Sequence, residues 1–299
     1  IGGAGVTAIH TKAYNDLTKP AVLPGFIHQL MNYLRSAGVD GVDVDLEGDL
    51  VKMSTYNDFV VQLGDSVHAA GLKMSAALAL WTASSVSLAS ANALDFINVM
   101  SYDQTGSWNP NSPGPHSTYD AAVQEFNYWK NTKSQAADKI VLGLPFYGYE
   151  FRNDNTAGAL TWCQIAGSYP NNVNDDQANT GNGIVYYNGK ETIKKKTEFV
   201  MDEKGGGVMI WELGQDCFGG ESLFDVILKT TGRDITSVEV KEEVENTQAC
   251  PNPARDVLHI NVIAGNYSVV LFDNLGKDVG FYRNVSKIST KNLSKGCFL

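Results

Sequence analysis

Three carboxylates alternate with apolar residues near the start of the chain. Asp43, Asp45 and Glu47 are separated by Val44 and Leu46, and on a strand a spacing of two sends alternate side chains to opposite faces. One face would then carry three acids whose Cα atoms lie about 6.5–7 Å apart. Because acids this close cannot all ionise cheaply in a partly desolvated site, one should hold a proton near neutral pH. We expect Glu47, the last of the three, to be a general acid.

Two other interpretations of these acids are less consistent with the sequence. A calcium-binding loop also spaces acids by two, but it needs a glutamate at its twelfth position, where Ser54 stands. A solvated acidic turn would not follow Val39 and Val42, which have the spacing of a strand. The pattern therefore favours a strand whose polar face lines a site.

Helical and strand periodicities alternate from residue 25 to about 232 and indicate repeated βα units. Glycines such as Gly38 and Gly71 follow the apolar stripes, as expected where helices end. The expected strands are 40–47, 72–80, 96–101, 140–146 and 207–213. The expected helices are 26–37, 59–67, 119–132, 190–203 and 221–230.

Strands that alternate with helices predict a parallel α/β sheet, either an open doubly wound sheet or a closed barrel. Periodicity does not distinguish the two. Polar residues follow several different strands, namely Glu47, Tyr102 with Asp103, Tyr147, and Trp211 with Glu212. Because active sites of (β/α)8 TIM barrels occupy that rim, the pattern favours the barrel.

Composition narrows the possible partners. A formal net charge of −10 would repel nucleic acid and anionic lipid, so a neutral or weakly polar substrate fits better. No apolar run reaches eighteen residues, and we expect no membrane span. Cysteines occur far apart and without zinc-finger spacing, so we expect neither a metal nor a cofactor and leave disulfide pairing open; they are Cys163, Cys217, Cys250 and Cys297.

The acidic strand resembles the signature of the family 18 glycoside hydrolases, which include chitinases and endo-β-N-acetylglucosaminidases. Residues 40–47, Asp-Gly-Val-Asp-Val-Asp-Leu-Glu, fill every fixed position of the fourth-strand pattern Asp-Gly-x-Asp-x-Asp-x-Glu. Three later segments resemble the sixth-, seventh- and eighth-strand motifs in the family's order, namely Met100–Asp103, Leu144–Gly148 and Gly207–Glu212. The resemblance implies a TIM barrel and a glycosidase.

The resemblance also implies substrate-assisted, retaining hydrolysis of β-1,4-linked N-acetylglucosamine polymers such as chitin. Glu47 would protonate the glycosidic oxygen, while the substrate's own 2-acetamido group attacks the anomeric carbon. Asp45 would hold the acetamido N–H, and Asp43 would share a proton with Asp45. Tyr102 would donate to the acetamido oxygen, and Asp103 would fix the local geometry.

Aromatic and pocket-lining residues are expected to bind the sugar chain. Trp211 resembles the floor beneath the cleaved sugar, and Trp108 resembles the aromatic platform on the leaving-group side. Trp81, Met100 and Tyr147 are further candidates for the pocket wall. For each of these residues except Trp108, which lies in a loop rich in glycine, proline and asparagine, ordinary core packing is the competing interpretation.

The start of the chain and one internal segment depart from the family pattern. Residues 1–3, Ile-Gly-Gly, resemble the end of the third-strand motif Ser-x-Gly-Gly without its serine. We therefore expect an N-terminally truncated barrel that starts in the third strand, without a signal peptide, and forms an open six-stranded sheet that is poorly stable and weakly active. Residues 152–189 are shorter than the α+β insertion of many chitinases, which predicts a shallow groove and endo-type cleavage.

A change in composition after Gly232 predicts three parts: a catalytic barrel at 1–232, an acidic linker at 233–246 and a small β-sandwich at 247–299. The last part, with Cys-Pro-Asn-Pro at 250–253, resembles the C-terminal sorting domain of type IX secretion in Bacteroidota, and it stops short at Leu299. The resemblance implies secretion machinery as a partner and an extracellular or cell-surface location. A carbohydrate-binding accessory module is the alternative.

Two other functions remain possible from the sequence. A non-catalytic chitin-binding lectin on the same scaffold usually lacks the terminal glutamate, which is present here as Glu47. An endo-β-N-acetylglucosaminidase that acts on N-glycans would share the catalytic strand. We favour the chitinase, acting as a monomer.

Overall fold

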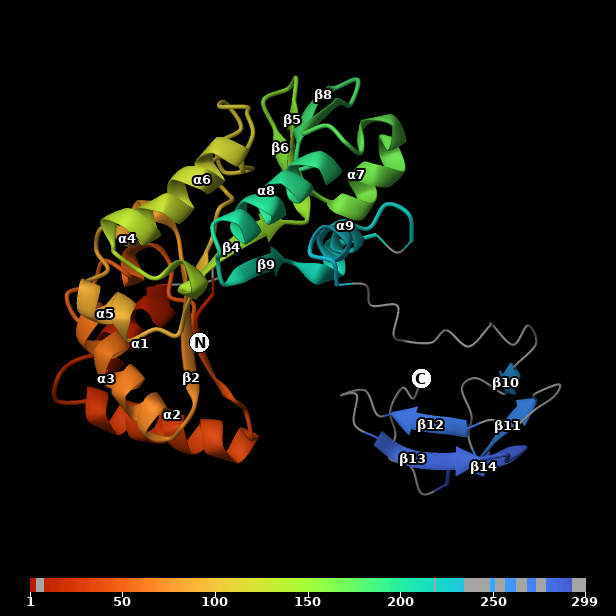
Figure 1. Cartoon of the computed structure of the whole chain (residues 1–299), viewed down its shortest axis with the longest axis horizontal. Helices are drawn as coiled ribbons and strands as arrows, with labels where there is room; N and C mark the ends of the chain where they lie inside the picture. Colours follow the sequence, from red (N-terminus) through yellow and green to blue (C-terminus); the bar gives the residue numbers. More distant parts are fainter. Residues whose placement is uncertain are drawn as a thin grey trace. The chain divides into compact units, whose positions relative to one another are not determined.

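A computed structural model (Figure 1) describes residues 1–3, 8–217, 219–233, 248–250, 256–261, 268–272 and 278–291. The chain divides into two compact units, Ile1–Asp234 and Ile235–Leu299. Each unit is described by itself. The acidic linker expected at 233–246 lies outside the described residues apart from Arg233.

The first unit is organised around a parallel sheet with the strand order β1-β2-β3-β4-β9. These strands are β1 (Gly41–Val44), β2 (Lys73–Leu78), β3 (Phe96–Val99), β4 (Ile140–Pro145) and β9 (Gly207–Trp211). Every neighbouring pair is parallel, which confirms the α/β class. In the described residues, the expected sixth strand is represented by one parallel bridge between Gly2 and Asp45.

Five predicted helices are present: α2 (Leu23–Ala37), α3 (Tyr56–Ala69), α6 (Tyr119–Asn127), α8 (Lys190–Asp202) and α9 (Leu223–Thr230). Gly38 ends α2 in the left-handed conformation, with φ of 65°. Sequence periodicity missed four other helices, most of them too short to show a stripe: α1 (Ala8–Leu17), α4 (Leu80–Ala83), α5 (Leu88–Asn92) and α7 (Trp162–Ser168). Single turns of 3₁₀ or π helix occur at Gly48–Leu50, Tyr128–Thr132, Ala137–Lys139, Pro170–Asn172 and Leu213–Gln215.

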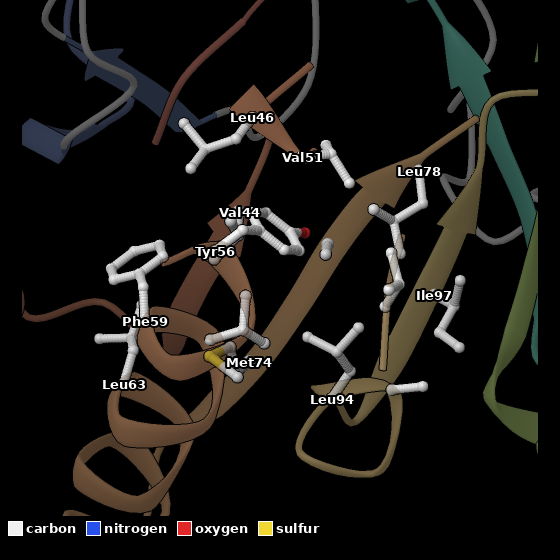
Figure 2. Close-up of a cluster of buried hydrophobic side chains, with 14 of the residues drawn as sticks. Val44, Leu46, Val51, Tyr56, Phe59, Leu63, Met74, Leu78, Leu94 and Ile97 are labelled. Carbon is white, nitrogen blue, oxygen red and sulfur yellow. The ribbon is translucent and has the colours of Figure 1, made fainter. Parts of the chain in front are cut away.

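The apolar residues between the three acids are buried against helix α3. Val44 and Leu46 are almost completely inaccessible and belong to a cluster with Tyr56, Phe59 and Met74 (Figure 2). Burial of each such aliphatic side chain contributes roughly 1.5–3 kcal/mol. This packing fixes the face on which the intervening carboxylates lie.

The segment after β4 is an α+β unit, which the prediction of a short excursion missed. Strands β5 (Tyr147–Arg152), β6 (Ala157–Thr161), β7 (Gln177–Asn179) and β8 (Gly183–Tyr186) form an antiparallel sheet in the order β6-β5-β8-β7. Helix α7 follows β6 directly. The strands are short and their turns are rich in glycine and asparagine, so composition alone concealed them.

The second unit contains short antiparallel strands. β10 (Gln248–Cys250), β11 (Val257–Asn261) and β14 (Lys287–Ser289) form one sheet, and β12 (Ser268–Phe272) pairs with β13 (Asp278–Arg283). Ile260, Leu271 and Ile288 form its buried cluster. The expected all-β character is therefore present in the described residues.

Cysteines and membrane spans complete the description of the fold. Cys163 and Cys217 are free thiols; Cys297 and the side chain of Cys250 lie outside the described residues. Within the described ranges, no helix has both the length and the apolar character needed to cross a bilayer.

Candidate active site

A cavity of about 650 Å³ lies at the carboxyl ends of the parallel strands. Its wall contains all the predicted site residues except Tyr147, namely Asp43, Asp45, Glu47, Trp81, Met100, Tyr102, Asp103, Trp108 and Trp211. Residues from β1, β3 and β9 and from the loops that follow them meet here, as expected for a site at the rim of a barrel.

Asp43 is held by polar residues on β2 and β3, the next two strands of the sheet. Its Oδ1 accepts hydrogen bonds from Ser75 Oγ at 2.5 Å and Asn98 Nδ2 at 3.0 Å. Ser75 lies directly opposite Asp43 in the register of β1 and β2. Sequence reasoning missed both donors, although two polar residues at inward positions of apolar strands were a usable signal. Proton sharing between Asp43 and Asp45 stays a prediction.

Asp45 keeps one oxygen free for a ligand. Its Oδ1 is buried and has no hydrogen-bond partner in the described structure, a state that is costly unless a donor arrives. Burial and the neighbouring Asp43 carboxylate raise the pKa of Asp45. The unpaired atom belongs to a residue of the cavity wall, where a ligand N–H could satisfy it.

Glu47 is a carboxyl group that can exist in both protonation states near neutral pH. Burial, assisted by the carboxylates of Asp45 and Asp103, raises its pKa to about 7. Gly48 follows in the left-handed conformation, with φ of 60°, and turns the chain into a 3₁₀ turn directly after the acid. A group with this pKa can donate a proton and later accept one.

Tyr102 presents a hydroxyl group that remains protonated. Burial raises its pKa above the usual range, and the Asp103 carboxylate raises it further. Close packing around the ring depends on Gly143 of β4, where a Cβ atom would lie 2.8 Å from Tyr102 Cε1 and 2.6 Å from the Val99 carbonyl oxygen. Tyr102 is therefore a fixed donor in the cavity wall.

Asp103 is oriented by two phenols and a histidine. Its Oδ1 accepts from Tyr147 Oη at 2.7 Å and Tyr149 Oη at 3.0 Å. Its N–H donates to His116 Nδ1 at 3.4 Å, and the other ring nitrogen of His116 contacts the Tyr147 carbonyl oxygen at 3.3 Å. The backbone of Asp103 is left-handed, with φ of 63°, so these partners fix a conformation that non-glycine residues rarely adopt.

Tyr147, which was predicted to line the substrate pocket, is absent from the wall of the main cavity. Tyr147 is only 7% exposed and lines an adjoining hollow of about 250 Å³ beside Trp211. It begins β5, and its hydroxyl group donates to Asp103. Tyr149 and His116, which sequence reasoning missed, complete this support.

Three tryptophans of the cavity wall are exposed, although large apolar side chains usually pack inside. Trp81, Trp108 and Trp211 retain 63%, 60% and 51% of their accessible surface. Core packing is therefore the wrong interpretation for Trp81 and Trp211. Trp81 lies on α4 rather than at a strand end. Flat aromatic faces around a polar site suit the apolar C–H faces of pyranose rings.

The carboxyl groups and the tyrosine hydroxyl group of the cavity wall suit acid–base chemistry. Within the part of the chain that the structure describes, no group of three or more histidine, cysteine, aspartate or glutamate residues could hold a metal ion.

Comparison with protein families assigns both units. The sequence model described as glycosyl hydrolases family 18 matches residues 1–216, and that of the secretion system C-terminal sorting domain matches residues 248–299. The sorting domain indicates export by type IX secretion to the cell surface or the extracellular space.

Curated relatives resemble the first unit over most of its length. Chitinase-3-like protein 2 from Homo sapiens is 27% identical over 251 residues, which cover 66% of this chain and 64% of the relative. Endochitinase 1 from Metarhizium robertsii is 26% identical and is covered to 58%, over 68% of this chain. The chain thus spans less than two thirds of the length of these relatives.

Solved structures share the fold. The GH18 chitinase ChiB from the chitin utilization locus of Flavobacterium johnsoniae is 34% identical with a TM-score of 0.69, over 77% of this chain and 72% of that one. A chitinase from Bacteroides thetaiotaomicron is 26% identical with a TM-score of 0.63, over 77% and 74%. With the family model matching most of the chain, this protein belongs to family 18 of the glycosyl hydrolases, on a TIM-barrel scaffold.

Proposed function

We propose that this protein is a chitinase that hydrolyses β-1,4-linked N-acetylglucosamine polymers by a retaining, substrate-assisted mechanism. The observation that carries the proposal is the pairing of Glu47, whose pKa is raised to about 7, with the unsatisfied Oδ1 of Asp45. Both lie in one cavity with three exposed tryptophans. A proton donor, an acceptor for an amide N–H and aromatic platforms are what a substrate with a reactive acetamido group requires.

The first chemical step uses the protonated form of Glu47. Its proton goes to the glycosidic oxygen as the C–O bond breaks, and the acetamido carbonyl oxygen of the substrate forms a bond to the anomeric carbon. Asp45 accepts the acetamido N–H and offsets the positive charge of the resulting oxazolinium ion. Tyr102 donates to the acetamido oxygen and holds it in line for attack.

The second step reverses the roles. Ionised Glu47 takes a proton from water, and the water oxygen attacks the anomeric carbon as the oxazolinium ring opens. Two inversions give overall retention of the β configuration. Asp43, fixed by Ser75 and Asn98, lies two residues before Asp45 on the same face of the strand, where the two acids can share a proton.

The substrate class follows from the platforms. Trp211 would lie beneath the sugar at the cleaved bond, and Trp108 and Trp81 would contact neighbouring sugars, with Met100 in the wall between them. Several platforms suit an oligomeric chain rather than a single sugar. Internal cleavage is consistent with the name of the relative Endochitinase 1, and we propose endo action by a monomer.

Product analysis tests this function. The chain is incubated with chitin oligomers and, separately, with a high-mannose glycoprotein, and the products are followed by proton NMR from the first minutes. We expect oligomer cleavage at internal bonds with the β anomer appearing first. The α anomer first would contradict the mechanism, cleavage of the glycoprotein alone would indicate an endo-β-N-acetylglucosaminidase, and binding without cleavage would indicate a lectin.

A further inference from the structure

A lysine side chain is completely buried behind the site. Lys196 of α8 has no accessible surface, and its Nζ lies 2.7 Å from Ser117 Oγ, 3.0 Å from the Ser117 carbonyl oxygen and 2.7 Å from Asn188 Oδ1. A buried ammonium group is costly unless it is fully hydrogen-bonded. Here each of its three protons has an acceptor.

The three hydrogen-bond acceptors around Nζ favour the charged form of Lys196, although burial lowers its pKa to about 7. The carbonyl oxygen of Ser117 and the amide oxygen of Asn188 carry no hydrogen, and the Ser117 hydroxyl donates its own hydrogen elsewhere, to the Ser101 carbonyl oxygen at 2.5 Å. Burial lowers the pKa of Lys196, while the carboxylates of Asp176 and Glu125 oppose this effect. Three acceptors and two nearby carboxylates together favour the ammonium ion.

The hydrogen bonds continue from Lys196 to the segment that carries Tyr102 and Asp103. Ser117 bonds to the carbonyl oxygen of Ser101, the residue directly before Tyr102. The adjacent His116 accepts from the N–H of Asp103 at its ring and from the N–H of Gln104 at its carbonyl oxygen, at 3.1 Å. Segment 116–117 is thus bonded along segment 101–104, and Asn188 Nδ2 also donates to the Ser117 carbonyl oxygen, at 2.7 Å.

We propose that Lys196, acting through Ser117, is a positioning residue that holds segment 101–104 so that Tyr102 and Asp103 face the cavity. The inference deepens the proposed function, on which its catalytic readout rests. The ammonium group polarises the Ser117 hydroxyl and so strengthens its bond to the Ser101 carbonyl oxygen. Because the chain of bonds ends on the backbone of segment 101–104, its loss should shift the Tyr102 hydroxyl and leave the tryptophan platforms in place.

Two substitutions break this chain of bonds at different points. Lys196→Met keeps the length of the side chain and removes the ammonium group, and Ser117→Ala keeps Lys196 and removes the connecting hydroxyl. Ser117→Thr restores a hydroxyl at the same position. The matched control is Lys194→Met, because Lys194 lies on the same helix with half of its side chain exposed.

Two readouts separate positioning from general stability. The first is amide hydrogen exchange of segment 101–104, which needs no activity: we expect exchange about tenfold or more faster in Lys196→Met and Ser117→Ala, with β2 unchanged. The second is hydrolysis of a chitin oligomer: we expect kcat to fall roughly 10- to 100-fold with KM little changed. Oligomer-binding stoichiometry, measured in a Glu47→Gln background, should stay at that of the parent.

The outcomes are distinct. Recovery by Ser117→Thr and no effect of Lys194→Met would support the proposal. Unchanged exchange in segment 101–104 would overturn it, as would unaltered activity in both Lys196→Met and Ser117→Ala. If Lys196→Met fails to fold, the Ser117→Ala and Ser117→Thr pair decides. If the parent protein hydrolyses nothing, the proposed function fails, and the exchange experiment still tests the positioning role.

Discussion

The carboxyl groups of the cavity and the buried ammonium group of Lys196 differ in how far the protein satisfies them with hydrogen bonds. Asp45 leaves an oxygen without a partner, and Glu47 is pushed towards its neutral form by burial and like charges. Lys196 is more deeply buried, yet three acceptors surround it. The difference shows where the protein tolerates unfavourable electrostatics and where it does not.

This contrast separates chemistry from positioning. A group that must bind a ligand or exchange a proton cannot be satisfied in advance, so the cavity acids should reduce stability while providing activity. A group that only orders its neighbours should be fully hydrogen-bonded and should increase stability. Substitutions in the two regions should therefore change activity and stability in different combinations.

Asp45→Asn should give the sharpest separation. We expect the rate of hydrolysis to fall by roughly 10²–10³, because the charge proposed to stabilise the transition state is lost. The Tm should stay the same or rise, since repulsion from the neighbouring carboxylates is removed. Kinetics and thermal melts of Asp45→Asn and Lys196→Met measure activity and stability side by side. An equal loss of Tm in both variants would contradict the difference between the cavity acids and Lys196.

The pH dependence of hydrolysis should report Glu47. Its pKa is raised to about 7, and protonated Glu47 is the proposed acid, so kcat/KM should fall by about tenfold per pH unit above this value. The folded state also binds this proton more tightly than the unfolded state, so ionisation lowers stability as pH rises from about 4.3 to about 7. A Tm that declines across this window in the parent but less in Glu47→Gln would support the prediction. A kcat/KM that already falls with rising pH well below pH 7 would contradict it.

Removing a platform should affect binding rather than chemistry. Trp211→Ala is expected to raise KM for a chitin oligomer by about tenfold, which corresponds to about 1.4 kcal/mol, because the sugar loses an aromatic contact. Stability should change little because the ring is half exposed. Steady-state kinetics and melts measure both quantities, and a large fall in Tm would show that Trp211 packs rather than binds.

The smallest effect should follow from a glycine beneath a platform. A Cβ atom at Gly106 would lie 2.4 Å from the Trp108 ring, whereas one at Gly114 in the same loop would meet nothing within 4 Å. Gly106→Ala should displace the Trp108 ring and raise KM about two- to fivefold. The corresponding loss of binding free energy is smaller than the roughly 1.4 kcal/mol of a tenfold change. Gly114→Ala is the control, and equal values for the two variants would contradict the account.

The sequence predicted the parallel sheet and the acidic strand well, because both depend on local periodicity. Val44 and Leu46 needed a covering helix, and their burial fixed the face of the three carboxylates. The exposure of Trp81 and Trp211 was not predicted, because each stands beside an apolar strand where core packing competes with binding. The antiparallel unit after β4 was not predicted because short strands with polar turns have no distinctive period.

Long-range polar partners were also beyond sequence reasoning. Asp43 is held by Ser75 and Asn98 from other strands, and no local pattern pairs such residues. Lys196 lies in a run of three lysines that resembles a solvated surface. Its spacing of three from buried Ile193 and four from buried Val200 on the same helix was the signal that places it inside.

Hydrolysis and binding by Glu47→Gln test the central claim most directly. The variant keeps the size and hydrogen-bonding capacity of the side chain but cannot transfer the proton. We predict that the rate of cleavage of chitin oligomers falls by about 10²–10⁴-fold. The dissociation constant measured by calorimetry should stay close to that of the parent, measured before the parent has cleaved the oligomer. Cleavage at the parental rate would show that Glu47 is not the acid and would contradict the account.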